Sequence, residues 1–358
     1  MKPLLLTRDA FREGVFARDK YVCVICGEPA TYNAKGQVNN LDAHHIIERR
    51  LFDSPSMFGG YFLDNGASLC SKHHIMAEQT TLSCEEIREA AGIKNIILPE
   101  HLYEDRYLRY DKWGNFILPN EQRVKGELFF DESVQKILEK GGVLDLFSKY
   151  VKYPRTHHLP WSEKQSKDDR ILESVDHFKG KEVIVTVKMD GENTTMYNDY
   201  IHARSLDSGT HPTRNWVKSL WGQKGYNIPE GWRVCGENLY AVHTIPYTNL
   251  KTLFYVFSIW DDKNNCLSWD DTLEWCELLE LEPIPVLYRG IFDEQLIKSL
   301  YQPTIDGNAC EGYVIRTADS FSYGSFRKCV AKFVSGNFKI NHGHWTKNKI
   351  ERNELAAS

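Results

Sequence analysis

The chain has 358 residues, of which 42% are hydrophobic and 12% aromatic, so it can build real cores, and its length favours two domains. This composition excludes a disordered protein, and the net charge of -5 excludes a uniformly basic nucleic-acid coat, although a local group of Lys and Arg can still bind phosphates. No apolar run approaches the roughly 18 residues of a membrane span, and nine cysteines are an odd number that suits a reducing compartment. We therefore expect a cytoplasmic protein with no membrane partner and no obligatory protein partner.

Two pairs of metal-ligating residues stand out near the N-terminus. Cys23 and Cys26 are separated by two residues, and Cys70 and His73 repeat that spacing. Two such pairs match the ligand spacing of one closed tetrahedral Zn²⁺ site. The alternative, free buried cysteines beside solvated histidines, would not explain both pairs. The spacing therefore predicts a structural zinc site.

Three further histidines, His44, His45 and His74, lie in the same region and are not needed by the zinc. With the CxxC pair, the His pair, the loop carrying Asn65 and the final His, residues 7–90 resemble the HNH nuclease family and its ββα-metal fold. The resemblance implies that His45 is a general base, that His44 and His74 hold a divalent metal, and that Asn65 braces the site as part of the nucleic-acid interface. An imidazole can deprotonate water while a metal stabilises charge on phosphorus. Such a site can also decay into a nucleic-acid grip, so cleavage and binding both stay open.

The stretch 96–148 is predicted to be a connector. Pro99, Gly114 and Pro119 interrupt it, and Asp131 is expected to cap a short helix that ends at Gly141. We assign this stretch no chemistry.

The chain from Lys181 onward is expected to be α+β. β-Branched and aromatic runs predict strands near 182–188, 194–205, 231–239, 251–260, 283–288, 311–316 and 328–334. Helices are expected near 270–280 and 293–301. Six short motifs follow one another at these strands: Lys188-x-Asp190-Gly191, Ala203-Arg204-Ser205, Cys235-Gly236-Glu237-Asn238, Phe254 to Ile259, Glu311 to Arg316, and Lys328 to Phe333. Each motif is weak alone, and their fixed order makes the series specific.

This order resembles the covalent nucleotidyltransferase superfamily of ATP-dependent ligases and capping enzymes, most closely its RNA ligase branch, over about residues 150–340. The resemblance implies an adenylyltransferase (ATP-grasp-like ligase) domain of antiparallel sheets with flanking helices. It also implies ATP, Mg²⁺ or Mn²⁺, and a lysine–AMP intermediate on Lys188. Because a phosphoramidate needs a neutral amine, we expect burial or nearby cations to lower the pKa of Lys188.

Matching by position assigns roles around the lysine. Lys332 and Lys328 would stabilise charge on the α-phosphate, as cationic groups do in phosphoryl transfer. The remaining implied roles belong to residues of the earlier motifs: Glu237 and Glu311 as metal or ribose contacts, Phe257 stacked on adenine, Arg204 on phosphate or ribose, and Asp190 and Asn193 orienting the lysine and the acceptor end.

The sequence departs from the family pattern in two motifs. Val187 stands where related enzymes often have a glutamate, so adenine recognition would depend on Thr186 or on backbone groups. The last motif keeps one lysine, Lys332, of the usual two. Lys328 lies four residues earlier and, by the period of two along a strand, is expected on the same strand face as a substitute.

Polynucleotide contacts are expected from basic residues with aromatic neighbours, of which Arg155 and Arg214 are the best candidates. Only 26 residues follow Lys332, which leaves no room for a C-terminal clamping domain. We therefore expect the N-terminal module to grip the polynucleotide. The expected domains are an HNH-like zinc module over 1–95, the connector over 96–148, a nucleotidyltransferase domain over 149–342 and a tail over 343–358.

We predict an ATP-dependent RNA ligase that joins a 3′-hydroxyl to a 5′-phosphate, with ATP, Mg²⁺ or Mn²⁺, and Zn²⁺ as cofactors. Its partner would be nicked or broken RNA, with DNA or an RNA–DNA hybrid as alternatives. A DNA ligase or a capping-type guanylyltransferase could use the same lysine. A further alternative is an HNH nuclease with an accessory nucleotide-binding domain.

Overall fold

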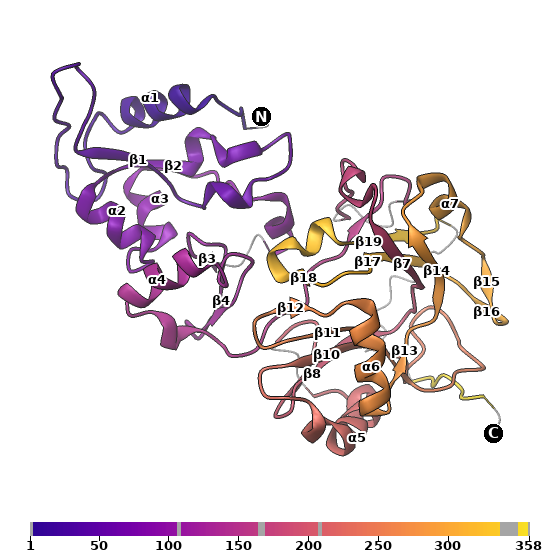
Figure 1. The fold of residues 1–358 in the computed structure, drawn as a ribbon. Coiled ribbons are helices and arrows are strands. Elements are labelled where there is room, and N and C mark those ends of the chain that lie inside the picture. Colours follow the sequence, from indigo (N-terminus) through magenta and orange to yellow (C-terminus); the bar gives the residue numbers. More distant parts are fainter. Residues whose placement is uncertain (1–2, 106–108, 164–168, 207–209, 337–349, 357–358) are drawn as a thin grey trace. The chain divides into compact units, whose positions relative to one another are not determined.

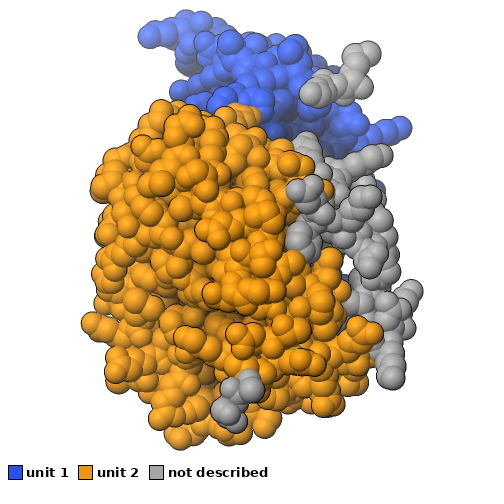
Figure 2. All heavy atoms as spheres, turned by 90° about the vertical axis from the view of Figure 1, so that its right-hand side faces the viewer, with its two compact units in different colours: residues 1–151 blue, residues 152–358 orange. Residues whose placement is uncertain are grey.

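The computed structural model divides the chain into two compact units, residues 1–151 and residues 152–358 (Figure 2). It describes residues 3–105, 109–163, 169–206, 210–336 and 350–356. Residues 96–148, predicted to be a connector, lie within unit 1. The boundary predicted between residues 342 and 343 falls outside the described residues. Among those residues, no helix has the length and apolar character needed to cross a membrane.

Unit 1 is built around a short antiparallel strand pair followed by a helix (Figure 1). Its elements are α1 (Arg8–Arg18), β1 (Leu41–His45), β2 (Gly66–Cys70), α2 (Ser71–Glu78), α3 (Cys84–Ala90), β3 (Arg109–Tyr110), β4 (Phe116–Ile117), β5 (Arg123–Val124) and α4 (Glu132–Lys140). The Thr7 side chain caps α1 by accepting from Ala10 N at 3.2 Å. Asp131 caps α4 in the same way. The predicted helix capped by Asp131 is therefore confirmed.

The meander β3–β4–β5 belongs to the same body as the β1–β2 pair. Lys112, in its first turn, accepts a hydrogen bond at its carbonyl from Glu48 N at 2.8 Å. The neighbouring Trp113 is buried, and its indole donates to the carbonyl of Glu78 at the end of α2, at 2.8 Å. Such backbone pairing of buried groups fixes the meander against the strand pair and α2.

Unit 2 contains two main sheets (Figure 1). The first has the order β14 (Val286–Ile291), β7 (Glu182–Val187), β17 (Gly312–Thr317), β19 (Val330–Val334) and β6 (His157–His158). The second has the order β18 (Phe321–Ser322), β12 (Asn265–Cys266), β11 (Phe254–Trp260), β10 (Arg233–Asn238), β8 (Glu192–Met196) and β9 (Ile201–Ala203), with β13 (Glu282–Pro283) beside β11. The other elements are α5 (Asn215–Lys224), α6 (Trp269–Leu279), α7 (Glu294–Ser299) and the small pair β15 (Thr304–Ile305) and β16 (Asn308–Ala309).

The predicted α+β class with antiparallel sheets is confirmed for unit 2, where only the β6–β19 and β11–β13 pairs among the described strands are parallel. Every region expected to hold a strand does so, although the stretch 194–205 is a hairpin of β8 and β9. Helix α5 was not predicted. Its first residue follows Arg214, for which the sequence predicted a polynucleotide contact and no secondary structure.

The predicted strand position of Lys328 is wrong. Residues Tyr323–Lys328 form a 3₁₀ turn, and β19 begins only at Val330. Tyr323 and Phe326 are both buried, and their spacing of three is the period of this turn rather than of a strand. Lys328 is exposed at the end of the turn and does not share a strand face with Lys332.

Candidate functional site

The centre of the candidate site in unit 2 is the end of β7. Five of its six residues are buried, because the apolar β-branched run suits a strand covered on both faces. Lys188 follows directly, and its backbone N–H donates to Gly312 O at 3.0 Å. Its amine donates to Glu311 Oε2 at 2.6 Å. Since Glu311 immediately precedes β17, the β7–β17 pair brings the lysine and its carboxylate together.

Gly191, just before β8, and Glu237, on β10, also contribute to the candidate site. The β8–β10 register places Asn193 opposite Glu237, and Gly191 N donates to Glu237 Oε1 at 3.0 Å. A Cβ atom on Gly191 would lie 2.5 Å from the carbonyl oxygen of Asn238, so the close approach of the two strands requires glycine here. The Asn193 Oδ1 atom is buried with no hydrogen-bond partner among the described residues, and Asn193 lines a cavity beside these strands.

A cavity of about 610 Å³ opens between residues of the two sheets. Most of the residues predicted for this site line it: Thr186, Val187, Lys188, Asn193, Arg204, Glu237, Phe257, Lys332, Arg155 and Arg214. Its size lies in the range of small-molecule pockets, and it combines one charged end with aromatic walls.

Three predicted residues do not line the cavity. Glu311 reaches the site through its contact with Lys188. Asp190 turns its carboxylate to the loop after β10, where Oδ2 accepts from Thr244 N at 2.7 Å and Ile245 N at 2.9 Å. Lys328 does not line the cavity and lies at the end of the 3₁₀ turn before β19.

The charged groups of the site shift one another's pKa values. Burial disfavours the ammonium of Lys188, but Glu311 and Glu237 outweigh it and raise its pKa to about 12. In the metal-free protein the pKa is therefore raised rather than lowered, because two carboxyl groups lie near the amine. Burial raises the pKa of Glu237 to about 8, against the opposing effect of Lys188. Burial and the Lys188 charge lower the pKa of Lys332 to about 8.

Several cavity residues were not predicted, notably His243, Trp260 and Phe326. Tyr153 also lines the cavity and packs edge-on against Phe257, with ring centroids 5.1 Å apart. Trp260 lies on β11 with Phe257, so the aromatic content of that strand could have pointed to it. His243 comes from a loop without a motif, and nothing in the sequence marks it.

Residues 181–334 match the RNA ligase family. This segment is less than half of the chain and contains Lys188, Glu237, Phe257, Glu311 and Lys332. The search of curated proteins found no match.

Solved structures with similarity to the chain include an RNA ligase mutant of Naegleria gruberi with ATP and Mn, at 16% identity and a TM-score of 0.37, covering 95% of this chain and 84% of that one. An apo RNA ligase mutant of the same organism is 22% identical, with a TM-score of 0.35, covering 47% of this chain and 53% of that one. A putative ATP-dependent DNA ligase from Aquifex aeolicus is 18% identical, with a TM-score of 0.35, covering 52% and 50%. The chain thus spans about half the length of the apo Naegleria gruberi structure and of the Aquifex aeolicus structure.

Unit 1 brings the four predicted zinc ligands together. The ligand atoms of Cys23, Cys26, Cys70 and His73 all lie within 4.8 Å of one another. The Cys26 and Cys70 sulfurs are 3.8 Å apart, which is the edge of a tetrahedron with Zn–S bonds of about 2.3 Å. Gly27, with φ of 75°, makes the turn after the first pair, and its N–H donates to Cys23 O at 2.8 Å. The donor set and its geometry therefore fit zinc.

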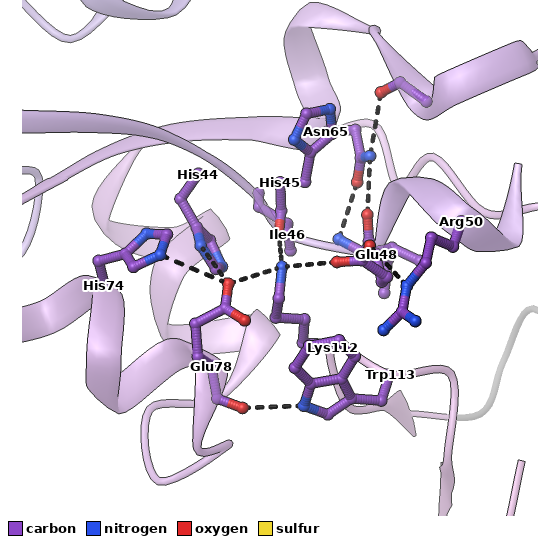
Figure 3. Close-up of polar contacts among 12 residues, drawn as sticks. His44, His45, Ile46, Glu48, Arg50, Asn65, His74, Glu78, Lys112 and Trp113 are labelled. Carbon is purple, nitrogen blue, oxygen red and sulfur yellow. Dashed lines mark hydrogen bonds and ion pairs between the residues drawn. The ribbon is translucent and has the colours of Figure 1, made fainter. Parts of the chain in front are cut away.

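A second group lies next to it, where His44 and His74 meet Glu78. The Glu78 Oε1 atom is 3.6 Å from His44 Nδ1 and 3.6 Å from His74 Nε2 (Figure 3). Neither ring nitrogen of the buried His44 has a hydrogen-bond partner among the described residues, and His74 Nδ1 also lacks one. Two imidazoles and a carboxylate around one point can hold a divalent cation. Glu78 was not predicted, although its position one helical turn after His74 could have revealed it.

His45 and Asn65 flank this group. Burial and Lys112 lower the pKa of His45 to about 4, and its ring stacks on Phe11 with centroids 4.6 Å apart. Asn65 is 1% exposed, and its amide holds the segment after β1 by accepting from Ile47 N at 2.9 Å and donating to Ile47 O at 3.1 Å. Asn65 is thus a brace. Its place in a nucleic-acid interface stays a prediction, and its polar atoms are bonded to backbone in this structure.

Proposed function

We propose that unit 2 is an ATP-dependent RNA ligase domain that forms a lysine–AMP intermediate on Lys188. The observation that carries this proposal is the position of Lys188 beside Glu311, at a cavity with a second lysine, in a segment that matches the RNA ligase family. Neither the cavity nor the motif alone would be specific.

The proposed first step is attack of the neutral Lys188 amine on the α-phosphorus of ATP. A P–N bond forms, the bond from the α-phosphorus to the bridging oxygen breaks, and pyrophosphate leaves. Lys332, at the same cavity, would hold the charge that develops on the α-phosphate oxygens. A 5′-phosphate end then takes the AMP from the lysine, and a 3′-hydroxyl displaces AMP to seal the strand.

The cavity residues suit a nucleotide and a hard cation. Phe257 offers a ring face to adenine, and Arg204 and Thr186 offer donors to phosphate or base. Glu237 and Glu311 are the oxygen ligands that Mg²⁺ or Mn²⁺ prefers. A bound cation would neutralise both carboxylates, which are the groups that raise the pKa of Lys188.

Labelling with α-labelled ATP tests the intermediate. Covalent label should appear on the native protein and be absent from Lys188→Ala. The matched control is Lys328→Ala, which removes an exposed lysine outside the cavity and should keep full labelling. Label from GTP but not from ATP would instead favour a capping-type guanylyltransferase. Sealing of nicked RNA, DNA and mixed duplexes by the native protein then separates an RNA ligase from a DNA ligase.

We propose as a second function that unit 1 is an HNH-like module with a structural zinc and a divalent-metal centre at His44, His74 and Glu78. The unpaired nitrogens of two buried or half-buried histidines favour this function. His45 is neutral at pH 7, because its pKa is lowered to about 4, so its ring can accept a proton from water. Metal-dependent nicking of RNA or DNA that His45→Ala abolishes would support a nuclease. If the native protein binds RNA or DNA but nicks neither, the module has a binding role instead.

A further inference from the structure

Lys112 of the β3–β4 turn lies beside the second metal group of unit 1 (Figure 3). It is 4% exposed, which is rare for a lysine. Its ammonium lies 3.0 Å from Glu78 Oε1, 3.3 Å from Glu48 Oε2 and 3.0 Å from the carbonyl oxygen of His45. An ammonium has three N–H donors, so these three acceptors satisfy it.

The turn that carries Lys112 is itself held in place. Asp111 Oδ1 accepts from the backbone N–H groups of Trp113 at 2.9 Å and Asn115 at 3.0 Å. The ammonium also lies 5.3 Å from the centroid of the Trp113 ring, within the range of a cation–π contact. Lys112 is therefore a fixed positive charge in this site rather than a mobile surface lysine.

The same oxygen of Glu78 faces both the lysine and the two histidines. A divalent cation held by His44, His74 and Glu78 would share that oxygen with the ammonium. Two positive charges within a few ångströms repel each other strongly in a half-buried site, where solvent screens little. Glu48 keeps its negative charge there, because Lys112 and Arg50 lower its pKa against the effect of burial.

We propose that Lys112 is a resident cation that competes with the divalent metal for Glu78, and that metal binding transfers Glu78 from Lys112 to the metal while Glu48 retains the lysine. This inference rests on the proposed metal centre of unit 1. It gives residues 109–117 a role that their sequence does not suggest: they set how tightly that centre holds its metal.

The test measures Mn²⁺ affinity by electron paramagnetic resonance on zinc-loaded full-length protein. The signal of this centre is the difference between each protein and the same protein carrying His74→Ala. Lys112→Met keeps the length and the apolar stem and removes the charge, so Mn²⁺ should bind at least about tenfold more tightly. Glu48→Gln leaves Glu78 as the main carboxylate partner of Lys112, so Mn²⁺ should bind several-fold more weakly, by about 3-fold or more.

Lys136→Met is the matched control, because Lys136 pairs with Glu132 on the exposed face of α4 and should leave the affinity unchanged. If Lys112→Met loses its zinc, Lys112→Gln, which keeps a donor to Glu78, and Glu48→Gln supply the test. Unchanged or weaker Mn²⁺ binding in the lysine variants, or unchanged binding in Glu48→Gln, overturns the inference. Equal Mn²⁺ binding with and without His74→Ala in the native protein would instead refute the metal centre itself.

Discussion

At the residue scale, Lys188, the proposed nucleophile of unit 2, lies near the carboxyl groups of Glu311 and Glu237. Glu311 bonds the Lys188 amine directly, and Glu237 acts on it through space. The pKa of Lys332 changes in the opposite direction. Burial and the neighbouring Lys188 ammonium lower it to about 8. In the ligand-free protein Glu311 and Glu237 therefore favour the protonated form of Lys188, and the proposed adenylation requires that this effect be offset.

Glu311→Gln should change two reactions of Lys188 in opposite directions. Loss of the carboxylate lowers the pKa of the Lys188 amine. Acylation of Lys188 by a small amine-reactive acylating reagent at pH 8 should therefore be faster, by about 3-fold or more. Formation of lysine–AMP should be slower, by about 10-fold or more, because the proposed cation ligand is gone. Peptide mass spectrometry quantifies the first and labelling the second, with exposed Lys328 as the internal reference. Slower acylation in the variant would contradict the charge assignment.

The pH dependence of adenylation follows from the same groups. The pKa of Lys188 is raised to about 12, so the neutral fraction grows with pH, by about tenfold per unit below that value. Around pH 8, where its pKa lies, Lys332 loses half of the charge proposed to hold the phosphate, and above pH 8 it loses most of the rest. We therefore expect kcat/KM for ATP in the labelling reaction to rise from pH 6 to 8 and to level off above 8. A value that does not change between pH 6 and 8 would rule out deprotonation of Lys188 as a limiting event.

Which site residues the sequence could predict depends on how local their geometry is. The candidate zinc ligands Cys23, Cys26, Cys70 and His73 were found because the spacing within each pair is a property of the sequence itself. The direction of the Lys188 pKa shift was not, because it depends on a glutamate 123 residues away. Lys112 likewise reaches Glu78 only through the packing of the meander on α2.

At the element scale, the described segment 350–356 supports the motif around Lys188. Asn353 is buried, donates to the carbonyls of Leu239 and Ala241, and accepts from Tyr247 N at 2.8 Å. The Tyr247 hydroxyl accepts from Asp190 N at 3.0 Å. A chain of contacts thus runs from the C-terminal segment through the loop after β10 to the residue two positions beyond Lys188.

Asn353→Ala should weaken this support. It removes three hydrogen bonds from buried partners, which should lower the free energy of unfolding by about 1–3 kcal/mol. If the loop also positions Asp190, the labelling rate should fall by about 3-fold or more while zinc content is unchanged. Glu354→Ala is the control, because Glu354 is exposed and contributes hydrogen bonds through its backbone. A stability loss with normal labelling would mean that the segment only stabilises the fold.

The residue composition and the length of each element explain whether it could be predicted from the sequence. Strands β7, β11 and β17 are apolar runs with β-branched or aromatic residues, and such runs are typical of strands. Helix α5 was missed because only one of its ten residues, Val217, is buried, so the stretch has no strong apolar face. The short strands β3, β4 and β5 have two residues each, too few for a period to show.

At the scale of the whole molecule, each unit has a core and a candidate site of its own. The candidate zinc ligands and the His44–His74–Glu78 group lie in unit 1, and the cavity at Lys188 lies in unit 2. A metal site that closes a small module contributes directly to its folding free energy. The two proposed chemistries should therefore respond separately to changes in either site.

Cys26→Ser tests this separation. Cys26 is the exposed zinc ligand, so the change removes one metal bond without opening a cavity in the core. Bound zinc should fall well below one per chain, and calorimetry should show one unfolding transition shifted to lower temperature while a second stays in place. The rate of labelling by ATP in excess Mg²⁺ should change by less than about 2-fold, because the groups that act on Lys188 belong to unit 2. Loss of labelling while the second transition is intact would show that adenylation depends on unit 1, and the zinc module would then be part of the ligase mechanism rather than a neighbour of it.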